Sequence, residues 1–128
     1  MDNLDLLAAE AAGAIVRDTI DPGGRRATDV ENLATKALGV LQENGVYAST
    51  LFLYSRPKSE EEIARAIRQQ LLQLAARVCR RPPPSDAAGD ALRFTSDLLS
   101  DLDMLLLLKQ VWEQTLIYAR YGAKAHKE

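Results

Sequence analysis

Residues 59–84 read SEEEIARAIRQQLLQLAARVCRRPPP, and this stretch decides the fold class. Apolar residues recur in it every three or four positions and fall within roughly 80° of one another on a helix of 3.6 residues per turn. They are Ile63, Ile67, Leu71, Leu74 and Val78. Ser59 and Glu62 have the spacing of a capping box, and the proline triplet forbids continuation. We therefore predict an amphipathic helix from Ser59 to about Arg80.

The same periodicity continues on both sides of this helix. A second capping box, Thr28 with Glu31, starts another helix, and Asn44-Gly45 is a typical helix stop. Gly122 is predicted to cap the last helix. Besides the helix at 59–80, we predict helices over Asp2–Thr19, Thr28–Asn44, Asp86–Leu99 and Ser100–Tyr121.

The segment from Val46 to Ser55 is ambiguous on local grounds. Its valine, threonine and aromatic residues favour a strand by propensity. No second strand is evident elsewhere in the sequence, and an isolated strand would leave its backbone polar groups unpaired. We interpret the segment as a short buried helix that ends before Pro57. The chain of 128 residues is then one all-α domain, residues 1–128, a compact bundle of about six helices without a β-sheet.

Several function classes lack their usual residues. A net charge of −2 does not suit a uniformly basic nucleic-acid binder. The one cysteine, Cys79, cannot form an internal disulfide or a thiolate cage, and we expect it to be packed. The one histidine, His126, sits at an end expected to fray, so we predict no catalytic site, no metal site and no cofactor. Because no signal region or membrane-spanning run is evident, we expect a cytoplasmic protein without membrane contact.

Charge is unevenly distributed along the chain. Residues 63–93 hold six basic and two acidic side chains, a net of +4, whereas residues 1–62 have a net of −5. Arginines on an exposed helix face can bind phosphates without reading bases, although a solvated helix surface explains the same pattern. The candidate RNA-binding residues are Arg65, Arg68, Arg77, Arg80, Arg81, Arg120 and Lys124. Leu72 lies off the apolar stripe of its helix, so we expect it to be exposed, and Leu72 and Tyr121 are candidate subunit contacts.

Three stretches of the sequence resemble the small helical subunit of the type III-B (Cmr) CRISPR RNA-guided effector complex. They are the amphipathic run Asn32–Gln42, the stretch NGVYASTLFLYSR at 44–56, and the closing helix Trp112–Ala125 with its basic and aromatic end. Their order and spacing agree over most of the chain. The proline triplet and the arginines before it have no counterpart in the family pattern.

The resemblance implies a non-catalytic scaffold. Small subunits of this family stack with copies of themselves, pack against other subunits of the effector, and help line the channel that holds the guide RNA and target RNA. The small subunits of type III-A and type I complexes are the nearest alternatives. A helical protein–protein adaptor that binds no nucleic acid is an alternative of another class. A helix-turn-helix DNA reader is disfavoured, because the residues after Asn44-Gly45 are apolar and aromatic rather than basic.

Overall fold

The first helix, α1, spans Leu4–Thr19 in the computed structural model, which describes residues 3–127. It begins where Asn3 accepts a hydrogen bond from the Leu6 amide at 3.1 Å, which satisfies one of the free N–H groups of the first turn. Asp2, at which the helix was predicted to begin, lies outside the described residues. The prediction of the α1 end at Thr19 is confirmed.

A single long helix, α2, spans Ala27–Tyr54, but it is not continuous in direction. Gly45 has φ 94° and ψ −173°, a conformation that is open to glycine and interrupts the helical path. The expected stop at Asn44-Gly45 is therefore a kink. The ambiguous segment after it is helical, as predicted, but it belongs to α2. For this reason residues 3–127 contain five α-helices rather than six.

The remaining helices are α3 (Glu61–Cys79), α4 (Ala88–Asp97) and α5 (Leu102–Ala125). Short 3₁₀ turns at Lys58–Glu60 and Leu98–Ser100 precede α3 and α5. No strand occurs between residues 3 and 127, so the all-α class is confirmed.

Both predicted capping boxes are wrong. Arg26, in a left-handed conformation, directly precedes α2, so the helix starts before Thr28 and brings Ala27 into the core at 3% exposure. At the start of α3 the residue before the helix is Glu60, and no side chain caps it. Glu62 instead forms an ion pair with Arg26 at 2.9 Å. Glu62, which the predicted capping box of α3 requires, is therefore engaged in an ion pair between the starts of α2 and α3.

The last helix also differs from the prediction at both ends. Asp101, not Ser100, caps α5 by accepting a hydrogen bond from the Met104 amide at 3.1 Å. Gly122 lies inside the helix, which continues to Ala125. A Cβ at position 122 would lie 3.1 Å from Cγ2 of Val16, so the glycine serves the close approach of α5 to α1.

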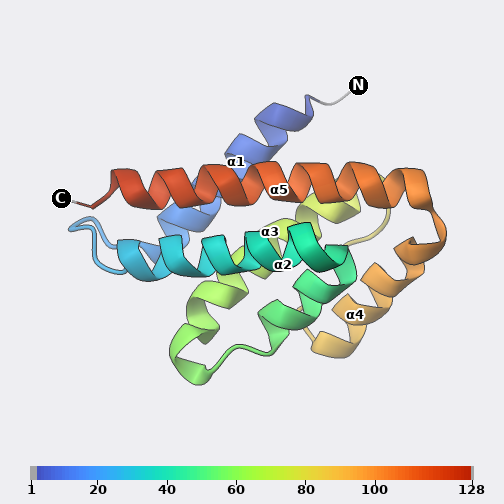
Figure 1. Cartoon of the computed structure of the whole chain (residues 1–128), viewed down its shortest axis with the longest axis horizontal. Helices are drawn as coiled ribbons and strands as arrows, with labels where there is room; N and C mark the ends of the chain where they lie inside the picture. The colour runs from blue at the N-terminus through green and yellow to red at the C-terminus, as the bar shows by residue number, and fades with distance from the viewer. Residues whose placement is uncertain (1–2, 128) are drawn as a thin grey trace.

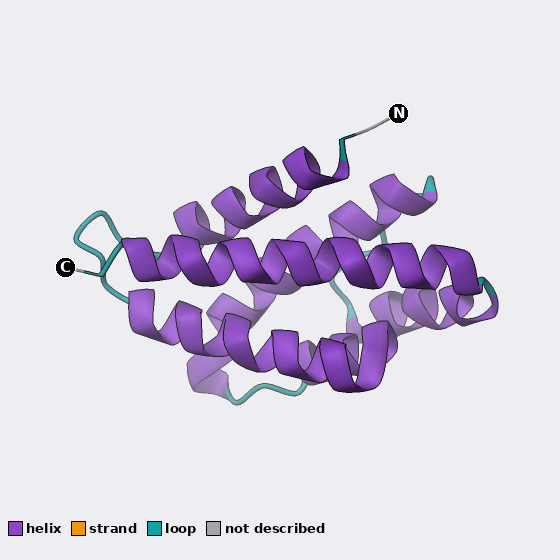
Figure 2. Cartoon of the chain, turned by 45° about the horizontal axis from the view of Figure 1, so that its top comes forward, coloured by secondary structure: helices purple, strands orange, loops and turns teal. Residues whose placement is uncertain are grey.

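Helix α5 runs the length of the molecule beside the first part of α2, and α1 and α3 pack around this pair (Figures 1 and 2). The core lies between these four helices, and α4 covers one end. Trp112 of α5 is 1% exposed at the centre, and its indole N–H donates to the Leu71 carbonyl of α3 at 2.8 Å. The outer faces and ends of α3 and α5 remain exposed, and the candidate RNA-binding residues lie on these two helices and just after α3.

Candidate nucleic-acid interface

The C-terminal end of α3 presents two exposed arginines in succession. Arg80 has φ 56° and ψ 49°, the left-handed conformation that usually falls to glycine at a helix end. Its amide bonds to the carbonyls of Ala76 and Arg77, and the Arg81 amide bonds to Ala76 at 2.9 Å. A non-glycine residue in this conformation costs about 1 kcal/mol. The chain bears that cost while holding the Arg80 and Arg81 guanidinium groups in solvent.

One turn earlier, Arg77 is exposed and lies at the edge of a groove between α1 and α3. The groove has a volume of about 320 Å³, and its polar lining comes from Gln70, Gln73, Arg77 and Glu10. The first three of these can donate hydrogen bonds to phosphate oxygens. The negative charge of Glu10 would repel a phosphate in this groove. Arg80 and Arg81, at the very end of α3, are therefore better placed than Arg77 to bind one.

Arg68 is not a surface residue, contrary to the expectation that it lies on an exposed helix face with the other candidate RNA-binding arginines. It is 4% exposed. Its guanidinium donates to both carboxylate oxygens of Asp86 at 3.0 Å and to both of Glu61 at 3.0 and 3.1 Å. The same group lies 4.3 Å from the ring centre of Tyr54. Because every side of the guanidinium is occupied by the protein, Arg68 holds together α2, α3 and the segment after the prolines.

Arg65 is exposed but stands beside the same carboxylates. Its Nη2 lies 3.6 Å from Glu61 and its Nε 3.8 Å from Asp86, both longer than good hydrogen bonds. Arg68 hydrogen bonds hold the pKa of Glu61 and that of Asp86 below their ordinary values. Both carboxylates therefore stay ionised at neutral pH, and Arg65 is a weaker phosphate contact than an arginine without acidic neighbours.

The C-terminal end of α5 forms the second basic region. Lys124 is exposed, and the Arg120 guanidinium lies 5.3 Å from the Tyr121 ring centre. Lys127 forms an ion pair with Glu31 of α2. The hydrogen bond from Lys127 lowers the pKa of Glu31. Part of the positive charge here is thus balanced by the α2 surface.

The two basic regions do not join into one face. The ends of α3 and α5 lie toward opposite sides of the molecule in both views (Figures 1 and 2). Arg77, Arg80 and Arg81 form one group, which we call the α3 basic end. Arg120 and Lys124 belong to the other. A single nucleic-acid duplex that contacts both groups would have to run along the long axis of the molecule.

The two predicted subunit contacts have different outcomes. Leu72 is 5% exposed, so the expectation that it faces solvent is wrong. Leu72 lies off the apolar stripe, but it lines a small hollow together with Pro83 and Pro84, so the segment after α3 comes close to that side of the helix. Tyr121 is 56% exposed, as a surface contact requires.

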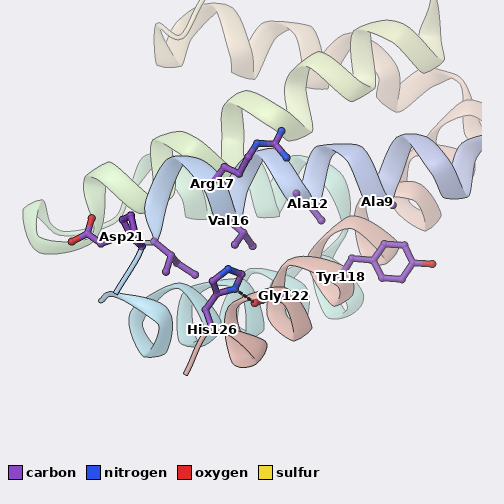
Figure 3. Close-up of a pocket in the computed structure, with 11 residues that line it drawn as sticks. Ala9, Ala12, Val16, Arg17, Asp21, Tyr118, Gly122 and His126 are labelled. Carbon is purple, nitrogen blue, oxygen red and sulfur yellow. Dashed lines mark hydrogen bonds between the residues drawn. The ribbon is translucent and has the colours of Figure 1, made fainter. Parts of the chain in front are cut away.

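A larger apolar groove of about 810 Å³ opens between α1 and α5 (Figure 3). Ala9, Ala12 and Val16 of α1 face Tyr118 and Gly122 of α5 across it. His126 is exposed, and its Nδ1 lies 2.8 Å from the Gly122 carbonyl oxygen. The backbone carbonyl of His126 packs against Gly24, and a Cβ at position 24 would lie 2.5 Å from the oxygen of that carbonyl.

Sequence reasoning missed two features of the surface. Asp86, the partner of Arg68, follows the proline triplet, and nothing in its spacing relates it to α3. Leu102 and Leu106 at the start of α5 are 65% and 57% exposed. Only Leu106 had a signal, because it belongs to five successive apolar residues, Met104–Leu108, which cannot all face one side of a helix. Cys79 is partly buried as predicted, and burial raises the pKa of its thiol.

Within residues 3–127 no group of three or more His, Cys, Asp or Glu side chains is arranged to hold a metal ion. In the same residues no helix has the length and apolar character needed to cross a membrane. Comparisons of the chain with protein-family models, with curated proteins and with solved structures find no match.

Proposed function

We propose that this chain is the non-catalytic small subunit of a type III-B CRISPR RNA-guided effector complex in the cytoplasm. In this role it packs against other subunits and copies of itself, and it helps to line the channel for the guide RNA–target RNA duplex. The chain contacts phosphates of that duplex through the α3 basic end. A small subunit of a type III-A or type I complex is the closest variant of the same proposal.

The observation that carries the RNA contact is the conformation of Arg80. Glycine would end α3 with less backbone strain than the left-handed Arg80. Because a second arginine follows directly, we infer that the two positive charges at this helix end have a binding role. Arg80 and Arg81 are both exposed. Such contacts bind the backbone of RNA without reading its sequence, as a subunit that serves many guides requires.

The bend at Gly45 supports the family assignment. The resemblance rests most on residues 44–56, in which a glycine is followed by an apolar and aromatic helix. In the structure Gly45 interrupts α2, and Val46, Ser49, Thr50 and Leu53 after it are buried. The sequence pattern therefore corresponds to a structural element of this chain, a kink followed by a packed helix.

A helical protein–protein adaptor without RNA is the second candidate. It is favoured by the exposed leucines at the start of α5, since contiguous apolar surface marks contact sites for proteins. Salt dependence separates the two functions, because only phosphate contacts release bound counterions in proportion to their number.

The test is the affinity of the reconstituted effector complex for target RNA over a salt series, with R80Q/R81Q in this chain. For every arginine–phosphate interaction that the substitutions remove, the slope of log affinity against log salt should fall by about one unit, equally for unrelated target sequences. The control is R17Q/K36Q, which removes the same charge from exposed positions of α1 and α2.

An unchanged slope with R80Q/R81Q in an assembled complex would reject the α3 basic end as an RNA contact. The α5 residues Arg120 and Lys124 would then be tested in the same way. Failure of the chain to join the complex at all, with the wild-type sequence and all partner subunits present, would reject the assignment to this family.

A further inference from the structure

Helix α4 has a smaller share of the core than the other helices. It has 10 residues, and no side chain caps its start. An isolated helix of this length is marginal in water, so α4 depends on the surface against which it packs. Its buried residues are Ala91, Phe94 and Thr95, and its tertiary contacts are mainly with α2. It lies at one end of the bundle, whereas α5 runs along the whole core (Figure 1).

The segment that leads into α4 is packed loosely on α3. A hollow of about 280 Å³ lies there, lined by Gln69 and Gln73 of α3 and by Pro83, Pro84 and Ser85 of the segment. Few apolar contacts therefore hold the segment in place. We call residues 82–97, which comprise this segment and α4, the α4 unit.

The hydrogen bonds between the α4 unit and the rest of the described chain converge on one residue, Asp86. The hydroxyl of Tyr54, at the end of α2, donates to the Asp86 backbone carbonyl at 3.0 Å and to its carboxylate at 3.3 Å. The guanidinium of Arg68 donates to both carboxylate oxygens at 3.0 Å. Asp86 thus links the α4 unit to the ends of two core helices at a single point.

Release of Asp86 would not leave a buried charge without a partner. Arg68 also donates to both carboxylate oxygens of Glu61, at 3.0 and 3.1 Å, and Glu61 lies on α3 with it. Arg65, the other cation near Asp86, is exposed and lies 3.8 Å away. Because an uncompensated buried charge is what makes the loss of an ion pair costly, Asp86 can leave at moderate cost.

We propose that the α4 unit opens while α1, α2, α3 and α5 stay folded, and that Asp86 is the latch that keeps it closed. In the open state α4 leaves α2, and Asp86 leaves Tyr54 and Arg68. Leu98, which is 1% exposed, anchors the end of the unit in the core. One end of the bundle thereby has two states, and the inference does not depend on RNA binding.

Native-state hydrogen exchange of the full-length chain, labelled with ¹⁵N and followed by NMR, measures such local opening. After correction for intrinsic rates, amides 91–97 should exchange about tenfold or more faster than the slowest amides of α5. Urea below the unfolding transition should accelerate the α5 amides more steeply than the α4 amides, because local opening exposes less surface.

Ile15→Val separates local opening from global unfolding. It removes one methyl group from a side chain of α1 that is 0% exposed, and it should accelerate the slowest amides of α1 and α5 about threefold or more. Amides 91–97 should keep their wild-type rates, because the contacts of residue 15 persist when only the α4 unit opens.

Asp86→Asn tests the latch, and Asp97→Asn, the same change at an exposed position of the same unit, is its control. Asp86→Asn should accelerate amides 91–97 about tenfold, since hydrogen bonds to a charged group are stronger than those to a neutral one. It destabilises the closed state relative to every open state, so the slowest core amides should accelerate by the same factor. Asp97→Asn should change these rates by less than about twofold. Tyr54→Phe should act like Asp86→Asn, with a smaller effect.

Three results would overturn the proposal. They are wild-type exchange of amides 91–97 as slow as that of the α5 amides, equal acceleration of α4 and α5 amides by Ile15→Val, and equal effects of Asp86→Asn and Asp97→Asn. Either of the first two would show that α4 opens only when the whole domain unfolds. The third would leave Asp86 without a latching role. If Asp86→Asn does not fold, Tyr54→Phe takes its place, and exchange at the wild-type rate in that variant would reject the latch.

Discussion

Arg68→Met should strongly destabilise the fold, although a surface arginine would tolerate the change. The substitution keeps the length and the apolar stem of the side chain but removes the guanidinium that bonds Asp86 and Glu61. Loss of one partner of a buried ion pair costs about 3–5 kcal/mol. Here both carboxylates retain 36% side-chain exposure and can be partly rehydrated, so we expect about 3 kcal/mol.

This destabilisation is measurable by urea unfolding followed through fluorescence of the only tryptophan, Trp112, which is 1% exposed. A decrease of about 3 kcal/mol lowers the melting temperature of a domain of this size by about 10 °C. The matched control is Arg65→Met, one turn earlier on α3. Its ion pairs are longer and its side chain is 54% exposed, so the expected cost is under about 1 kcal/mol.

Unfolding free energies of the two variants within about 0.5 kcal/mol of each other, a difference near the limit of the method, would refute the structural role of Arg68. A folded and stable Arg68→Met whose assembled complex no longer holds RNA would refute it as well. In that case Arg68 would be reaching RNA after all, and its buried position in the free chain would not describe the complex. Substitution of Arg68 is otherwise unsuitable as a test of RNA binding, because unfolding would mimic the absence of phosphate contacts.

For three other perturbations the structure predicts the direction in which stability changes. The pKa values of Glu61 and Asp86 are lowered in the folded chain, so the stability that these carboxylates contribute is present above about pH 4 and is lost as the pH falls below it. Urea midpoints measured from pH 6 to pH 3 should therefore fall less steeply in Arg68→Met than in the wild type. Parallel curves for the two proteins would contradict this expectation. Arg80→Gly should change thermal stability by between zero and about +1 kcal/mol while weakening RNA retention, and a decrease above about 1 kcal/mol would show that the arginine is kept for structure. Gly122→Val should lower the unfolding free energy by about 1–3 kcal/mol, measured by thermal unfolding, because the new side chain crowds Val16. In Gly122→Ala the gain in helix propensity should offset much of the smaller crowding. Equal stability of the two variants would contradict the close packing of α1 on α5.

The sequence alone was sufficient for the helical class and for most helix positions. Apolar residues at helical spacing specify which face of a segment is buried, and this information is local. The end of α1 at Thr19 and the break after Asn44 could be read from turn residues for the same reason. The helical state of residues 46–54 was also predictable, from the lack of any partner strand.

The ends of α2, α3 and α5, and the roles of individual polar residues, were decided only by tertiary structure. Glu62 could cap α3 or pair with Arg26, and only the approach of α2 to α3 makes the second choice available. Gly122 could end a helix or admit a neighbouring one, and Val16 settles which. Arg68 shows the principle most clearly. On a helical wheel it lies at the edge of the polar side, and it is buried because Asp86, 18 residues away, folds back to meet it. Local spacing fixes the direction in which a side chain points, whereas its partner depends on which distant segments the packed core brings near.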